Sequence, residues 1–291
     1  MEFLKALLFG ILEGITEWLP VSSTGHLILL ERFVTLGVGG SAPPELSEAF
    51  YEMFGVVIQL GAIAAVAFRC YRRLSPFAGG KTPSERRDTV RLYLRLLVSG
   101  LPAALVGVLG DAALERFTGR DVDGWLYNGR TVAVMLILYG FLFLIPERCL
   151  PRRRETAFAV EEIGFGTALG IGCFQALSII PGTSRSGATI LGGMMLGLTR
   201  SAAAEYSFLL AIPTMMGASL LKTAKFACFV SERGLTVPWE AYAVLFVGMA
   251  AAFLVSLLTV GFLMDFVKKH TFAPFGVYRI LLGAAVLLWV A

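Results

Sequence analysis

The chain has 291 residues, of which 56% are hydrophobic and 16% charged, and its formal net charge is +4. Its mean hydropathy is +0.74. Soluble domains carry roughly 25% charged residues, so this chain lacks the polar surface of a soluble globular enzyme. Disordered, collagen-like and coiled-coil proteins are excluded too. The net charge does not indicate nucleic-acid binding, because an excess of Lys and Arg in a membrane protein records its orientation.

Long, continuous apolar stretches predict an all-α polytopic membrane protein, whereas a membrane β-barrel would show short alternating segments. Six stretches are long enough to cross, or nearly cross, roughly 30 Å of hydrocarbon as helices. They are residues 50–68, 92–110, 131–146, 203–222, 240–264 and 274–290.

Two further apolar stretches are interrupted by polar segments that contain Pro and Gly. Residues 3–30 are broken at Leu-Pro-Val-Ser-Ser-Thr-Gly (19–25), and residues 163–198 at Pro-Gly-Thr-Ser-Arg-Ser-Gly (181–187). Such backbone is tolerated at membrane depth only where protein or water covers it. We therefore expect two re-entrant helix–loop–helix hairpins.

The basic residues predict how these segments are oriented. Fifteen Lys and Arg lie in loops 69–95, 147–162 and 265–273 and at Arg200, against seven in the intervening segments. The positive-inside rule places the first group in the cytoplasm. The spans then alternate consistently between the two sides of the membrane only if each hairpin enters and leaves on one side. The first hairpin would enter from outside and the second from the cytoplasm.

The order of one hairpin followed by three spans occurs twice. We therefore expect one membrane domain, residues 1–291, with two inverted-topology repeats at about 1–146 and 163–291 and basic cytoplasmic loops at 69–95 and 147–162. A weak echo between residues 54–61 and 208–217 agrees with this. Inverted repeats with broken helices place a binding site near the midplane, where the two breaks meet.

The first hairpin carries two carboxylates at membrane depth. Glu13 and Glu17 are four residues apart and share one helix face. They need a cation between them, a proton on one of them, or a basic partner. A hard divalent cation such as Mg²⁺ or Ca²⁺ suits oxygen ligands. The alternative is an ion-coupling carboxylate pair in a transporter.

A serine and a histidine follow the first break. The chain restarts a helix near Ser22 and Ser23, and the free N–H groups of a first turn bind anions. Ser23 and His26 can lie on one face, so that His26 serves as general base and Glu17 orients its ring. The alternative is a capping serine beside a packed histidine. Thr24 adds a third hydroxyl to this break.

The second hairpin predicts an anion site. The guanidinium of Arg185 matches the geometry of a phosphate. Hydroxyl groups and free N–H groups complete a phosphate-sized cradle, which comprises Gly182, Ser184, Ser186 and Thr189. Arg279 on the last span either contacts a second phosphate or pairs with a carboxylate. Together these groups indicate phosphoryl transfer. The chain has no Walker motif, so we expect a lipidic substrate rather than a nucleotide.

Both breaks resemble known motifs. Residues 13–27, EGITEWLPVSSTGHL, and residues 181–189, PGTSRSGAT, are similar to the two signatures of the bacitracin-resistance family of undecaprenyl-diphosphate phosphatases. Residues 58–61, residues 205–213 and the terminal Tyr278-Arg279 also fit. The resemblance covers nearly the whole chain.

This resemblance implies a hydrolase of the bacterial inner membrane. It would convert undecaprenyl diphosphate to the monophosphate carrier of peptidoglycan synthesis, depend on a divalent cation and open towards the periplasm. Glu13 and Glu17 match the acidic motif of this family, Ser23 and His26 match its catalytic serine and histidine, and Ser184, Arg185 and Thr189 match its second motif. Together with the residue chemistry, we expect catalytic roles for Ser23, His26, Glu17 and Arg185 and a cation at Glu13 and Glu17. We expect substrate binding by the cradle with Ser22, Thr24 and Arg279.

Several alternatives stay open at this point. The nucleophile is Ser23, His26 or water. An inverted-repeat secondary transporter or flippase for an anionic solute or lipid phosphate would share the architecture. Partners are the lipid substrate and membrane lipids, with no nucleic acid. A homodimer is one of the open oligomeric states.

Overall fold

The computed structural model describes residues 1–38, 42–118, 126, 128–149 and 157–289. Regular structure within these residues is helical, apart from one isolated bridge between Ala157 and Leu198. The first hairpin and the spans that follow it comprise α1 (Glu2–Thr16), α2 (Ser23–Glu31), α3 (Pro44–Val57), α4 (Gln59–Arg69), α5 (Tyr71–Leu74), α6 (Pro83–Thr118) and α8 (Gly129–Cys149).

The second half of the chain begins with two short 3₁₀ helices and another hairpin. Its elements are η1 (Val160–Glu162), α9 (Phe165–Ala176), η2 (Leu177–Ile179), α10 (Arg185–Met195), α11 (Arg200–Glu232), α12 (Trp239–Lys269) and α13 (Ala273–Trp289). The prediction of an all-helical membrane protein is thereby confirmed. The basic run Arg152–Arg154 of the predicted loop 147–162 lies outside the described residues.

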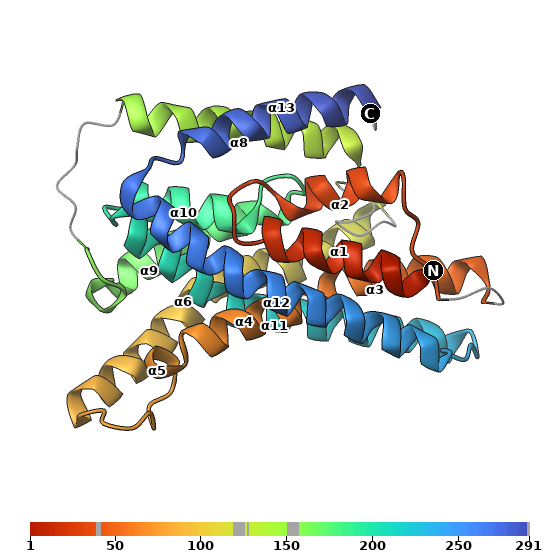
Figure 1. Cartoon of the computed structure of the whole chain (residues 1–291), viewed down its shortest axis with the longest axis horizontal. Coiled ribbons are helices and arrows are strands. Elements are labelled where there is room, and N and C mark those ends of the chain that lie inside the picture. The colour runs from red at the N-terminus through yellow and green to blue at the C-terminus, as the bar shows by residue number, and fades with distance from the viewer. Residues whose placement is uncertain (39–41, 119–125, 127, 150–156, 290–291) are drawn as a thin grey trace.

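Four helices are long and apolar enough to cross a membrane: Pro44–Arg69, which combines α3 and α4, Pro83–Gly110, Arg200–Glu232 and Trp239–Lys269. Each coincides with one of the predicted spans. The other two predicted spans coincide with shorter apolar helices, Gly129–Ile145 and Ala273–Leu288. These two pack closely on each other and form a separate layer above the hairpins (Figure 1). The described helices therefore make a multi-pass membrane protein.

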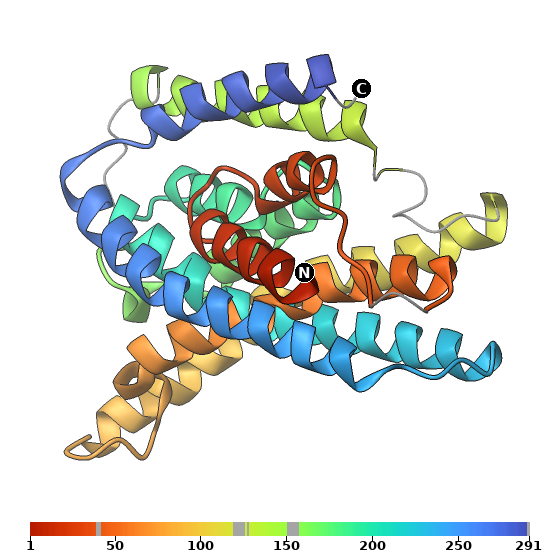
Figure 2. The same cartoon turned by 45° about the vertical axis from the view of Figure 1, so that its right-hand side comes forward.

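Both hairpins lie in the middle of the molecule. In Figures 1 and 2, α1, α2 and α10 lie below the α8–α13 layer, and α9 packs beside α6. The hairpins exchange partners: α1 packs on α12 from the other half of the chain, and α9 packs on α6. This arrangement brings the two interrupted segments together in the interior.

Close helix contacts at glycines hold the hairpins in place. A Cβ on Gly10 of α1 would overlap the carbonyl of Gly248 on α12, and one on Gly172 of α9 would overlap the backbone of Ser99 on α6. Helices approach this closely in membranes only where one of them lacks a side chain. The glycines therefore set the depth at which each hairpin lies against its partner helix.

Candidate active site

Each hairpin turns at a serine that caps the returning helix. Ser22 and Ser184 have φ angles of 72° and 69°, in the left-handed region that non-glycine residues rarely adopt. Their hydroxyl oxygens accept hydrogen bonds from the amides of Gly25 at 3.4 Å and Gly187 at 3.1 Å. Ser-x-x-Gly thus folds in the same way at both turns and directs the first turns of α2 and α10 inward.

The two tips contact each other directly. The hydroxyl of Ser186 in the second hairpin donates to the carbonyl oxygen of Glu17 in the first, at 3.0 Å. Arg185 donates to the Glu17 carboxylate at 2.9 Å, and the guanidinium lies 5.7 Å from the ring centre of Trp18. Residues separated by more than 160 positions therefore form one buried polar cluster.

Glu17 is the centre of this cluster. One carboxylate oxygen accepts from Arg185, and the other accepts from the hydroxyl of Ser23 at 2.7 Å. Only 6% of the Glu17 side chain and 11% of the Arg185 side chain are exposed, so water screens this ion pair little. Of the three ways to accommodate the predicted carboxylate pair, the basic partner is therefore present at Glu17.

His26 is held by different groups from those the sequence predicts. Its Nδ1 lies 2.7 Å from the carbonyl oxygen of Ser22, and its Nε2 lies 2.6 Å from the hydroxyl of Tyr278. The predicted relay, in which Glu17 orients His26 and His26 contacts Ser23, therefore differs from the structure. Glu17 contacts Ser23 itself, whereas His26 contacts the Ser22 carbonyl and the Tyr278 hydroxyl on α13.

Arg279 joins the two tips and is fully buried. It donates to the carbonyl oxygens of Pro20 at 3.2 Å, Gly182 at 2.7 Å and Thr183 at 2.9 Å. Its guanidinium also lies 5.5 Å from the ring centre of Tyr139. The contacts are thus backbone carbonyls from both breaks. The carboxylate pairing that the sequence left open at this position is not among them.

The remaining hydroxyl groups of the cradle are near Arg185. Thr189 lies 2.6 Å from the hydroxyl of Ser207 on α11, and Arg185 donates to the carbonyl oxygen of Ser207 at 2.7 Å. Ser184 lies 3.2 Å from Ser186. Thr24 is half-buried on the first turn of α2. The predicted residues of the second break therefore gather on one side of Glu17.

Sequence reasoning missed Ser207 and Tyr278. Ser207 lies on α11 and Tyr278 on α13, and Tyr278 is 252 residues from His26. A polar residue at membrane depth is a usable signal. Tyr278 precedes a buried arginine, and Ser207 follows Glu205 and Tyr206 in an apolar helix. No local spacing rule identifies the partner of either residue.

Glu13 differs from Glu17 in that it forms no ion pair with a described residue. It is fully buried, and neither carboxylate oxygen has a hydrogen-bond partner within the described residues. Its polar neighbours are Glu17 and Gln59. A buried carboxylate beside a second carboxylate needs a cation or a proton, so Glu13 fits an oxygen ligand for a hard cation. Within the described part of the chain, no three His, Cys, Asp or Glu side chains cluster around a common ion position.

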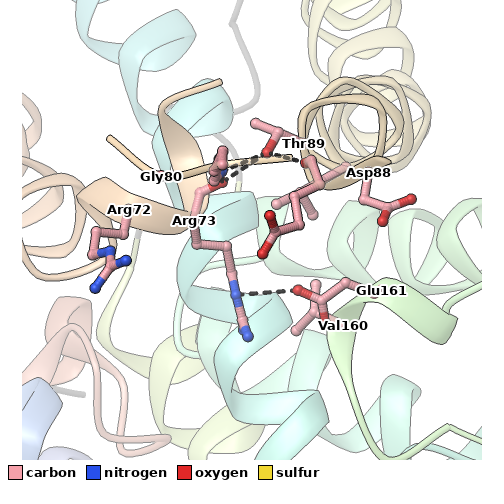
Figure 3. A pocket seen from close by; sticks show the side chains of 10 residues that line it. Arg72, Arg73, Gly80, Asp88, Thr89, Val160 and Glu161 are labelled. Carbon is pink, nitrogen blue, oxygen red and sulfur yellow. Dashed lines mark hydrogen bonds and ion pairs between the residues drawn. The ribbon is translucent and has the colours of Figure 1, made fainter. Parts of the chain in front are cut away.

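A charged cavity lies apart from the tips, in the predicted basic loop 69–95. It has a volume of about 330 Å³ and is lined by residues of α5, α6 and η1. Figure 3 shows Arg73 pointing to Glu161, at 3.2 Å. Arg73 also pairs with Glu205, and Lys81 donates to Thr89 at 2.7 Å. Two of the cations that line this cavity, Arg73 and Lys81, therefore have partners within the protein.

Comparison with known proteins agrees with these motifs. Residues 6–285 match the family model described as bacitracin resistance protein BacA. An Enterococcus faecalis protein named undecaprenyl-diphosphatase is 47% identical, covering 99% of this chain and 97% of its own length. A protein of the same name from Acetivibrio thermocellus is 46% identical over 99% of this chain and 98% of its own length. This chain therefore belongs to the bacitracin resistance protein BacA family.

Proposed function

We propose that the protein is a membrane-embedded phosphatase that hydrolyses undecaprenyl diphosphate to undecaprenyl phosphate and inorganic phosphate. The relatives that are named undecaprenyl-diphosphatase match this chain over nearly its whole length. This reaction recycles the lipid carrier of peptidoglycan synthesis. It also removes the diphosphate that bacitracin sequesters, which is the basis for a role in bacitracin resistance.

The observation that carries this function is the contact of Ser23, Glu17 and Arg185 between the tips. It joins a hydroxyl nucleophile, an acceptor for its proton and a cation for phosphate oxygens. Phosphoryl transfer needs these three elements, in a site from which water is largely excluded. A transporter needs a buried charge pair but no hydroxyl held against the carboxylate.

The first step is attack by Ser23 on the terminal phosphorus. The phosphate competes with Glu17 for Arg185, so substrate binding frees the carboxylate to take the serine proton. The new bond joins Oγ of Ser23 to phosphorus, and the anhydride P–O bond breaks. Undecaprenyl phosphate leaves with the electron pair.

The second step hydrolyses the phosphoserine. Water attacks phosphorus, and Nε2 of His26, the ring nitrogen that is not turned towards the Ser22 carbonyl, is the final acceptor of its proton. The P–Oγ bond breaks, and Oγ recovers its proton from Glu17. Inorganic phosphate is released, so the serine and both bases return to their starting states once His26 has lost its proton to water.

Glu13 is our candidate ligand for the divalent cation, because its carboxylate oxygens have no hydrogen-bond partner within the described residues. A bound Mg²⁺ or Ca²⁺ would neutralise charge on the phosphate oxygens. Glu17 is less suited in this arrangement, since Ser23 and Arg185 occupy both of its oxygens. Arg279 and the hydroxyl groups of Ser184, Ser186 and Thr189 maintain the shape of the cradle.

We also propose that the two halves are inverted repeats. The equivalent capping geometry of Ser22 and Ser184 supports this, as does the exchange of hairpins between α6 and α12. With the basic loops in the cytoplasm, the protein would lie in the bacterial inner membrane with its site accessible from the periplasm.

Phosphate release by the purified protein tests this function. We expect release from undecaprenyl diphosphate in detergent, where no gradient exists. Glu17→Gln and Arg185→Ala should lower the rate by at least roughly 100-fold, which corresponds to about 2.7 kcal/mol of transition-state stabilisation. Ser178→Ala is the matched control, because this hydroxyl only donates to the Gln175 carbonyl. Unchanged release by both site variants would refute the enzyme and favour a transporter.

A further inference from the structure

Both nitrogens of the His26 imidazole contact groups that the proposed reaction leaves unchanged. The Ser22 carbonyl oxygen lies 2.7 Å from Nδ1. A carbonyl oxygen only accepts hydrogen bonds, so Nδ1 carries a hydrogen. In the neutral ring, Nε2 is then the lone-pair nitrogen, and it faces the Tyr278 hydroxyl at 2.6 Å. The structure thus defines one tautomer of His26.

The hydroxyl of Tyr278 can serve His26 in both of its protonation states. It donates to Nε2 when the ring is neutral, and it accepts from the Nε2 hydrogen when the ring is protonated. The two states differ by one proton and by which atom of the pair, Nε2 or the phenol oxygen, carries the shared hydrogen. A phenol is therefore able to keep its contact with the imidazole while the ring gains and loses a proton.

The aromatic rings reinforce this contact. The His26 and Tyr278 rings are stacked, with centres 5.6 Å apart and planes inclined by 9°. The next residue on α13, Arg279, is anchored by three carbonyl oxygens of the tips. The position of Tyr278 relative to α2 is therefore set by the same contacts that hold the tips together.

The pair lies at the edge of the buried cluster. Tyr278 is 45% exposed, whereas Glu17 and Ser23 are at most 9% exposed. Tyr278 thus extends from the buried cluster to the surface of the protein.

We propose that the Tyr278 hydroxyl relays the proton of the attacking water to Nε2 of His26 in the water-dependent step, because this hydroxyl occupies the Nε2 lone pair in the structure. This inference rests on the proposed function. The phenol O–H bond breaks as its hydrogen passes to Nε2, and a new O–H bond forms with the water proton, so Tyr278 returns to its starting state.

The kinetic test uses Tyr278→Phe, which keeps the stacked ring and removes the hydroxyl. We expect kcat to fall about tenfold, equivalent to the loss of one hydrogen bond, while KM stays within about twofold. Tyr242→Phe is the matched control, because Tyr242 is exposed on α12 and far from the tips in sequence. In a His26→Ala background, Tyr278→Phe should cause no further loss.

A spectroscopic measurement tests the contact between His26 and Tyr278 independently of enzyme activity. His270 is the only other histidine of the chain, so His270→Asn leaves His26 as the single source of imidazole ¹⁵N signals. We expect a protonated Nδ1 in that protein, and a shift of the Nε2 resonance when Tyr278→Phe is added. Tyr242→Phe should leave the Nε2 resonance unchanged.

The outcomes separate this inference from the function on which it rests. Phosphate release by the unsubstituted protein with an undiminished kcat in Tyr278→Phe overturns the role of Tyr278 alone. An Nε2 resonance that does not move overturns the contact itself. If the unsubstituted protein releases no phosphate, the proposed function fails, and the role of Tyr278 in catalysis fails with it.

Discussion

At the scale of single residues, buried charge organises the centre of this protein. Arg185 neutralises Glu17, Arg279 is surrounded by carbonyl oxygens, and Glu13 has no hydrogen-bond partner among the described residues. In an apolar chain each such group has a cost, and each must be compensated by a partner or used by a ligand. The sequence identifies these residues because so few charges lie at membrane depth. It does not identify their partners, because Ser207 and Tyr278 reach them only through the fold.

Arg279 offers a prediction at this scale. Arg279→Met keeps the length of the side chain but leaves three carbonyl oxygens of the tips without their donor. We expect a loss of roughly 3 kcal/mol or more in stability, since hydrogen bonds to charged groups contribute about 1.5–3 kcal/mol each. The melting temperature in detergent should fall accordingly.

The matched control for Arg279 is Arg233→Met. Arg233 is exposed and pairs with Glu45 on the surface at 2.7 Å, so its loss should change stability by less than about 1 kcal/mol. An Arg279→Met protein with unchanged melting temperature and a raised KM would instead assign Arg279 to direct substrate binding.

At the scale of elements, the two hairpins are the unusual feature. Pro and Gly within apolar stretches predicted both breaks, and the helices end close to the predicted positions. Sequence could not supply the left-handed φ of Ser22 and Ser184, because glycine is the residue expected there. Sequence also could not predict that α1 packs on α12 and α9 on α6, each in the other half of the chain, since this depends on contacts between distant helices.

Close packing of the hairpins predicts an asymmetry between two glycines. Gly172→Ala should destabilise the protein by about 1–3 kcal/mol, because the added methyl group overlaps the backbone at Ser99. Gly217→Ala on α11 meets open space, so it should be neutral or stabilise by up to about 1 kcal/mol. Thermal unfolding in detergent compares the two variants. Equal stability of both would contradict the close contact between α9 and α6.

At the scale of the whole molecule, orientation follows from the distribution of Lys and Arg. Phe77 lies exposed between α5 and α6, next to the basic residues of loop 69–95, and Thr236 lies exposed between α11 and α12. In a background without native cysteines, Phe77→Cys should react with a membrane-impermeant thiol reagent only after the cells are opened. Thr236→Cys should react in cells whose inner membrane is intact. The reverse pattern would invert the proposed orientation.

The contact between the two tips explains why the family signatures lie at two places about 160 residues apart. Each signature forms one tip, and neither tip alone combines Ser23 and Glu17 with Arg185. A site assembled in this way depends on the correct docking of both halves of the chain.

The most direct measurement is the identification of the phosphorylated residue. The protein is mixed with undecaprenyl diphosphate labelled in its terminal phosphate, quenched during turnover and mapped by peptide mass spectrometry. We expect the labelled phosphate on Ser23, none in Ser23→Ala and an accumulation of labelled protein in His26→Ala, where the attack of water is impaired. Label on His26, or near-full turnover by Ser23→Ala, would contradict it.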